Sequence, residues 1–356
     1  MPVKEHIDQG VAGKSEEFGR SRIRSRKTIT LKTLMLLIIF TIIIISALFG
    51  FLYYRGQKPV TSVLPVTNKK PEYRFSIYEG RYRLSHPIAV FVYNSTNIYI
   101  SNNKNHTVEI VGPNGKPKGV IGGAGDLPGN LMFPYGLAVL PGGNILIAET
   151  GNYRIEEYSP EGKYIKTFLG PGNKAGIQKP GPVCIDDRGQ IYVGDLSGNQ
   201  VVKFDRDAKV LEKFPNISYP HGIAVDVARN KLYISDSGAS VIKVYELDSS
   251  KAVVNNDELN EEPVRQPRQI IDSIVSGVNF SMVRGLAVDR NGRLYAVDTL
   301  TSMIRVFDTD GKYLFSFGKQ GSGDGEFLYP AGIYVDDAGR IYIADWGNNR
   351  IQVWGY

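Results

Sequence analysis

A block of fourteen residues recurs six times along this chain without a gap, and this repetition strongly limits how the chain can fold. Each block opens with an apolar residue, usually followed by tyrosine, and has an acidic or amide residue at its fifth position. A β-branched residue stands six positions further on. The copies are IYISNNKNHTVEIV (98–111), ILIAETGNYRIEEY (145–158), IYVGDLSGNQVVKF (191–204), LYISDSGASVIKVY (232–245), LYAVDTLTSMIRVF (294–307) and IYIADWGNNRIQVW (341–354).

A shorter apolar block precedes each copy, and a further strand pattern such as YLFSFG (313–318) follows it, with turn residues in between. Each unit therefore predicts four antiparallel strands. Six such units are typical of an all-β, six-bladed β-propeller, which we expect to span residues 72–356. Segment 73–78 has no unit of its own, so we expect it to pair with the strand that contains Val353 and to close the ring in the last blade.

The last unit resembles the NHL repeat. GSGDGEFLYPAG (321–332) has the pattern G-x-G-x-G-E-F-x-x-P-x-G, and Asp345 is followed at the expected spacing by Asn349 and Arg350. The resemblance extends over about residues 73–356, with a polar insertion at 249–268 in the fourth unit. It implies a six-bladed propeller that presents one face to a protein, peptide or glycan partner.

An acidic side chain ends the second strand of five units, directly before a tight loop, and an amide does so in the first. Carboxylates at such positions accept backbone N–H bonds, so we expect each of them to hold its own loop together. This structural role is favoured over metal binding at any single copy. The residues are Glu149, Asp195, Asp236, Asp298 and Asp345, with Asn102 in the first unit.

The residues directly before the inner-strand blocks are expected to surround one mouth of the central channel. His86 and His221 fall in the first and fourth units, so we expect them to face each other across the channel. The third block position is small in most units, as at Ala89 and Cys184, and the cysteine is expected to be a small buried residue and not a catalytic thiol. The predicted ring consists of His86, Tyr135, Gly181, His221, Arg284 and Ala331.

Two functions are open for this mouth. His86, Tyr135, His221 and Arg284 predict a binding site for an anion or a peptide. The resemblance also allows a metal-dependent lyase or hydrolase, because NHL-like lyases that cleave peptidyl-α-hydroxyglycine hold a catalytic zinc with histidines in such a cavity. A zinc site needs three protein ligands, whereas this ring supplies two. We therefore favour binding over catalysis and predict no cofactor, while zinc or calcium in the channel stays open.

The N-terminal region predicts a membrane anchor. The run at 33–54 has no charged residue and, at about 1.5 Å per residue, is long enough to cross a bilayer. Basic residues concentrate just before it, so we expect residues 1–32 in the cytoplasm and the propeller outside the cell, on a stalk of residues 55–71. Most of the net charge of +6 lies in the N-terminal region, and the nearly neutral propeller argues against nucleic-acid binding.

Overall fold

The structure is a computed structural model of the whole chain. The residues that it describes are 35, 39–41, 44, 46, 69–247 and 265–356. The chain divides into two compact units, Met1–Thr67 and Asn68–Tyr356, and the strands among the described residues belong to the second.

The predicted arm (1–32), most of the predicted anchor (33–54), most of the stalk (55–71) and most of the insertion (249–268) lie outside the described residues. The few described residues within the predicted anchor are helical. Among the residues described, no helix has the length and apolar character needed to span a membrane.

The strands of the second unit form six four-stranded antiparallel sheets, the blades. The inner strands are β2 (Pro87–Tyr93), β6 (Pro134–Val139), β10 (Pro180–Ile185), β14 (Ile223–Asp226), β18 (Val283–Val288) and β22 (Pro330–Val335). The second strands are β3 (Asn97–Asn102), β7 (Ile145–Glu149), β11 (Ile191–Asp195), β15 (Lys231–Asp236), β19 (Leu294–Asp298) and β23 (Ile341–Asp345).

The third strands and the outer strands follow in each blade. The third strands are β4 (Thr107–Val111), β8 (Arg154–Tyr158), β12 (Gln200–Phe204), β16 (Val241–Glu246), β20 (Met303–Phe307) and β24 (Arg350–Gly355). The outer strands are β5 (Pro117–Gly122), β9 (Tyr164–Leu169), β13 (Val210–Phe214), β17 (Gln269–Ile271), β21 (Tyr313–Phe317) and β1 (Glu72–Ile77). The described helical segments of this unit are η1 (Asn103–Asn105), η2 (Val227–Arg229), α2 (Ser273–Ser276) and η3 (Trp346–Asn348).

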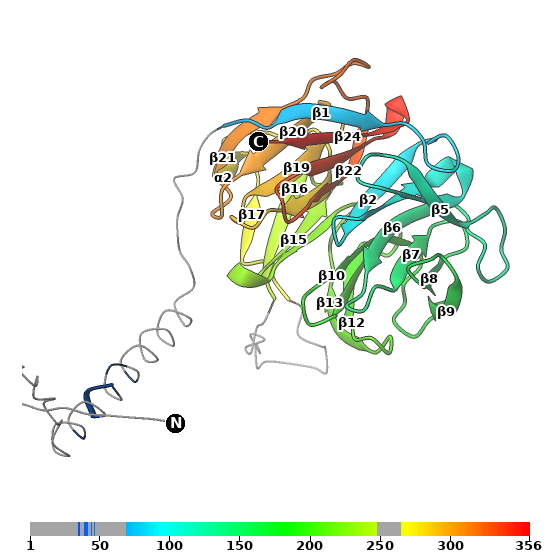
Figure 1. Cartoon of the computed structure of the whole chain (residues 1–356), viewed down its shortest axis with the longest axis horizontal. Helices are drawn as coiled ribbons and strands as arrows, with labels where there is room; N and C mark the ends of the chain where they lie inside the picture. The colour runs from blue at the N-terminus through cyan, green and yellow to red at the C-terminus, as the bar shows by residue number, and fades with distance from the viewer. Residues whose placement is uncertain (1–34, 36–38, 42–43, 45, 47–68, 248–264) are drawn as a thin grey trace, which may run out of the picture. The chain divides into compact units, whose positions relative to one another are not determined.

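The inner strands form a closed ring, in which each contacts the inner strands of both neighbouring blades and β22 contacts β2. Six buried apolar clusters lie between the blades, one at each junction of neighbours. Because a blade packs against two neighbours, both of its faces need apolar side chains, and β7 and β11 are buried along their whole length. This arrangement confirms the predicted six-bladed propeller (Figure 1).

The first strand of the propeller, β1, lies beside β24 and closes the ring (Figure 1). In the register of this antiparallel pair, Phe75 lies opposite Val353 and Ile77 lies opposite Ile351. The predicted pairing of segment 73–78 with the strand of Val353 is confirmed. The last blade is therefore built from both ends of the propeller. β1 pairs with β24, which would otherwise be an open edge strand.

The glycine that opens four of the inner blocks is required by the close approach of neighbouring inner strands. A Cβ atom on Gly222 would lie 2.1 Å from the carbonyl oxygen of Arg284, and one on Gly332 would lie 2.2 Å from that of Ile88. A side chain at these positions would push neighbouring blades apart.

Candidate functional site

The first blade begins its inner strand in a register that differs from the predicted one. Pro87 pairs with Asn102, as Pro134 pairs with Glu149 in the second blade. The sequence alignment instead placed Pro87 level with Gly136, two residues too far along. The apolar pattern of β2 continues without a break, and alanine stands where four of the blocks have the glycine, so the apolar pattern by itself does not fix the register.

This shift removes His86 from the predicted ring, and Ile88 takes its place. The imidazole of His86 packs edge-on against Trp346, with ring centroids 4.3 Å apart, and burial lowers its pKa. His86 does not line the central cavity, so the predicted pairing of His86 and His221 across the channel is wrong. The backbone of His86 is left-handed, with a φ of 53°. Phe133, Tyr219 and Tyr329 have nearly the same φ, between 50° and 52°.

Tyr135, His221 and Arg284 come together at the channel mouth. The Tyr135 hydroxyl lies 2.6 Å from Nδ1 of His221, and their rings stack with centroids 6.1 Å apart. Burial, reinforced by the charge of Arg284, lowers the pKa of His221 to about 3, so this histidine is neutral at physiological pH. Burial also raises the pKa of Tyr135, so its hydroxyl stays protonated. Tyr135 can donate its hydroxyl proton to Nδ1 when His221 carries its own proton on Nε2.

Arg284 is a cation without an acidic neighbour. Its Nε is buried and has no hydrogen-bond partner, and no carboxylate of the described residues lies within ion-pair distance of it. Its charge acts on both Tyr135 and His221. By contrast, Arg154 and Arg350 are paired with carboxylates.

A cavity of about 360 Å³ follows the central channel next to this cluster. All six inner strands line it, and the polar side chains in the lining are those of Tyr135, Cys184, His221 and Tyr334. Burial raises the pKa of the Cys184 thiol to about 12, so this thiol is not ionised. Phe91, and not Ala89, takes the place of the small residues in the first blade, and its ring packs against Tyr334 with centroids 4.7 Å apart.

The loop acids fix the chain where it enters each inner strand. Asp195 accepts the backbone N–H groups of Gln178 and Lys179 at 2.9 Å, and Asp345 accepts that of Leu328 at 2.8 Å. We expected donors from within the loops, but backbone donors of that kind occur only at two of the described acids. These are Ser197 N–H to Asp195 at 3.3 Å and Ala239 N–H to Asp236 at 3.2 Å.

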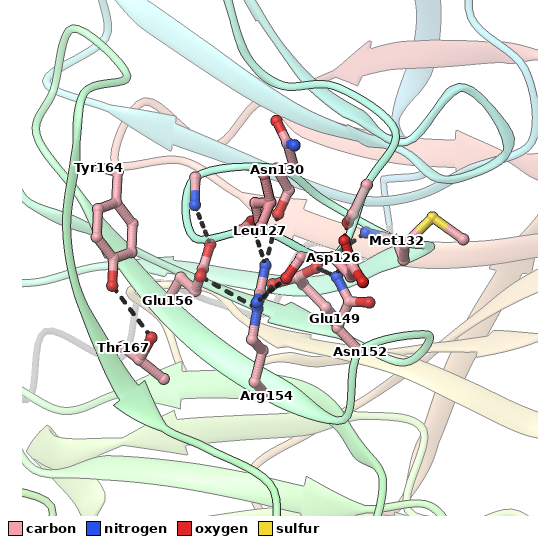
Figure 2. A network of polar contacts seen from close by, with 12 residues as sticks. Asp126, Leu127, Asn130, Met132, Glu149, Asn152, Arg154, Glu156, Tyr164 and Thr167 are labelled. Carbon is pink, nitrogen blue, oxygen red and sulfur yellow. Dashed lines mark hydrogen bonds and ion pairs between the residues drawn. The ribbon is translucent and has the colours of Figure 1, made fainter.

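In the second blade the loop acid is part of a buried network (Figure 2). Nε of Arg154 lies 2.7 Å from a carboxylate oxygen of Glu149 and 3.1 Å from one of Glu156. Burial raises the pKa of Glu149 against the opposing effect of Arg154. The same guanidinium donates at 2.6–3.0 Å to the carbonyl oxygens of Asp126, Leu127 and Asn130. Arg154 therefore ties the glycine-rich linker to its blade.

The residues present do not fit a catalytic zinc or a calcium site. Nδ1 of His106 accepts the backbone N–H of Phe133 at 3.0 Å, and His221 lies beside the positive charge of Arg284. Within residues 69–247 and 265–356, no three side chains of His, Cys, Asp or Glu are grouped so that they could hold a metal ion. No chemical step through a metal is therefore derived for this mouth.

An aromatic residue precedes the proline of the inner strand in three blades, and sequence reasoning missed it. Phe133, Tyr219 and Tyr329 are 40%, 56% and 44% exposed, respectively. At two of these residues the backbone is hydrogen-bonded to the preceding blade. The N–H group of Phe133 donates to the side chain of His106, and that of Tyr219 donates to the side chain of Asn199. The repeated aromatic-proline dipeptide was the signal available in the sequence.

Two family descriptions match parts of the chain: a six-bladed β-propeller matches residues 284–355, and an SMP-30/gluconolactonase/LRE-like region matches residues 179–317. The chain is 28% identical to the protein brain tumor of Drosophila melanogaster over 142 residues, 39% of this chain and 13% of that protein. It is 27% identical to NHL repeat-containing protein 3 of Homo sapiens over 184 residues, 48% of this chain and 50% of that protein. The chain thus spans about half or less of the length of these relatives.

Solved structures share the architecture. A gluconolactonase from Xanthomonas campestris superposes with a TM-score of 0.59 at 16% identity, covering 84% of this chain and 99% of that one. A luciferin-regenerating enzyme superposes with a TM-score of 0.60 at 12% identity, covering 81% and 96%. Such identities show the fold alone. The chain is a six-bladed β-propeller whose relatives include NHL-repeat proteins.

Proposed function

We propose that the propeller binds a protein or peptide partner through the face on which its inner strands begin. The observation that carries this proposal is the set of exposed aromatic side chains around the channel mouth, Phe133, Tyr219 and Tyr329. Exposed aromatic residues are enriched in binding hot spots, because they bury a large area with few rotatable bonds. The NHL-type relatives are consistent with a partner-binding role.

The aromatic face is fixed before a partner arrives, which reduces the entropy lost on binding. The three aromatic residues share a left-handed backbone conformation that is uncommon for large side chains. Such a conformation persists only where the surroundings enforce it, here through hydrogen bonds that the N–H groups of Phe133 and Tyr219 donate to side chains of the preceding blade. A rigid aromatic surface suits a preformed peptide segment.

Selection of a random peptide library on the purified chain tests this proposal. We expect the dominant peptides to lose at least about tenfold in affinity for the variant F133A/Y219A/Y329A, in line with the loss of one hot spot. The matched control is I165A/L211A/I270A, which removes three exposed apolar side chains from the outer strands β9, β13 and β17. Selected peptides that depend on the control residues instead would refute the proposal. Binding restricted to a glycan array would show that the partner is a glycan.

We further propose that the propeller stands outside the cell, anchored by residues 33–54 with residues 1–32 in the cytoplasm. The uncharged run and the basic residues before it support this orientation. A tag at the N-terminus should resist protease added to intact cells, whereas a tag after Tyr356 should be removed. Resistance of both tags, or of the C-terminal tag alone, would contradict the proposed orientation.

The alternative function is a metal-dependent lyase or hydrolase that acts at the channel mouth. The enzymes of known structure support it only through the shared fold, and the described histidines do not form a three-ligand site. Under this alternative, the purified chain would contain stoichiometric zinc, and turnover would disappear in His221→Ala. Zinc content below a tenth of an equivalent, with no change in melting temperature on chelation, would exclude it.

A further inference from the structure

The channel mouth holds a positive charge that nothing in the described structure neutralises. Arg284 has no carboxylate partner, and the residues that line the adjoining cavity include neither Asp nor Glu. An unpaired cation beside apolar surface is unfavourable, because it loses part of its hydration without gaining an opposite charge. The mouth is therefore electrostatically complementary to an anion.

Two N–H donors at this mouth have no acceptor among the described residues. One belongs to Arg284, whose Nε is enclosed and without a partner and whose charge acts on Tyr135 and His221 in the cavity lining. The other is Nε2 of His221, which carries the proton when Tyr135 donates to Nδ1. A carboxylate has two oxygens and accepts two such hydrogen bonds at once.

The cavity next to these donors offers apolar surface to the body of a ligand. Its volume of about 360 Å³ lies within the range of small-molecule sites, and aliphatic side chains of the inner strands form most of its lining. A bare inorganic anion would leave this surface wet, whereas an apolar group would displace its water. The observations thus specify both ends of a ligand, a charged end at the mouth and an apolar end in the channel.

We propose that the channel binds a small monocarboxylic acid, with its carboxylate at Arg284 and His221 and its apolar body in the cavity. This inference does not depend on the partner proposed above. The two tests use different residues, so either proposal can fail while the other stands.

Isothermal titration of the purified full chain with 3-phenylpropionate tests the inference. We expect this acid to bind, and 3-phenylpropanamide, which has the same body without the charge, to bind at least about tenfold more weakly. Acetate, which has the charge without the body, should also be at least about tenfold weaker. Equal binding of the acid and the amide, or no binding of the acid at millimolar concentration, would overturn the proposal.

The variants locate the site. Arg284→Met should weaken binding of the acid about tenfold to a hundredfold and leave binding of the amide unchanged, because only the charge-assisted bond is lost. The matched control is Arg290→Met, which removes an exposed arginine that is paired with Asp337 and should not change either affinity. Unchanged affinity for the acid in Arg284→Met would refute the site. If that variant does not fold, the comparison of acid and amide on the wild-type chain decides.

Discussion

Replacing Arg154 by methionine should strongly destabilise the propeller. The substitution keeps a similar side-chain length but leaves Glu149 and Glu156 buried without their shared cation. Breaking a buried ion pair from one side costs about 3–5 kcal/mol, and three backbone carbonyls of the linker also lose their donor. We expect a loss of about 4 kcal/mol or more in the free energy of unfolding, and a fall of about 10 °C in melting temperature.

The loss should depend on pH in a defined direction. The pKa of Glu149 is already raised by burial, and removing Arg154 raises it further. A carboxyl with a higher pKa in the folded state favours folding below its unfolded pKa, about 4.3, and loses this contribution as the pH rises through the folded pKa. The difference between the variant and the wild type should therefore shrink as the pH falls from 7 towards the unfolded pKa of the carboxyl.

Urea denaturation of the purified chain, followed by tryptophan fluorescence, measures both effects. Lys166→Met is the matched control, because it breaks a 3.6 Å pair with Glu157 in which the lysine is 52% exposed, and such surface pairs contribute only about 0–1 kcal/mol. The triple variant E149Q/R154M/E156Q, which removes all three charges, should be more stable than Arg154→Met alone. If Arg154→Met cost no more than the control and showed no pH dependence, the buried network would not stabilise the fold as argued.

Three further predictions follow from the inner ring and its closure. Gly222→Ala should lose about 1–3 kcal/mol, because its Cβ would meet the carbonyl of Arg284, whereas Gly170→Ala, with its nearest neighbour 3.9 Å away, should leave the melting temperature unchanged. Deleting residues 350–356 should abolish cooperative unfolding, since it removes the strand that joins β1 to β23; an unchanged melting temperature would rule out the closure. The imidazole NMR signal of His221 should not shift between pH 5 and 8, because its pKa is about 3. Between about pH 3 and 6.5 this histidine is protonated only in the unfolded state, so its contribution destabilises the fold progressively as the pH is lowered, and His221→Gln should remove that contribution.

The architecture of the propeller could be predicted from the sequence because the repeat records it several times. The second and third strands carry apolar residues on both faces, since each blade packs against two neighbours, and the turn residues separate them regularly. The closing strand was predictable for a related reason. Segment 73–78 had a strand pattern but no unit, while the strand of Val353 had no fourth partner.

The partners of single side chains were harder to predict, because they depend on contacts between blades. Nothing in the sequence near His106 indicates that its Nδ1 accepts an N–H from the next blade. The unpaired charge of Arg284 is equally invisible, since the absence of a carboxylate can be established only when all neighbours are placed. The loop acids show the same limit: their residue type predicted backbone acceptors, but their donors came from about 17 residues upstream, as for Asp345 and Leu328.

The misplacement of His86 has a more general physical cause. Side chains alternate along a strand with a period of two, so a shift of two residues leaves every side chain on the same face. The apolar pattern of β2 therefore fits both registers, and it is the proline that distinguishes them: Pro87 lies opposite Asn102 and eleven residues before Ile98, as Pro134 lies eleven residues before Ile145. Yet this shift changes the chemistry of the mouth, because it replaces a second histidine by Ile88. What remains is one neutral histidine beside one unpaired arginine, an arrangement that favours an anion over a metal cation.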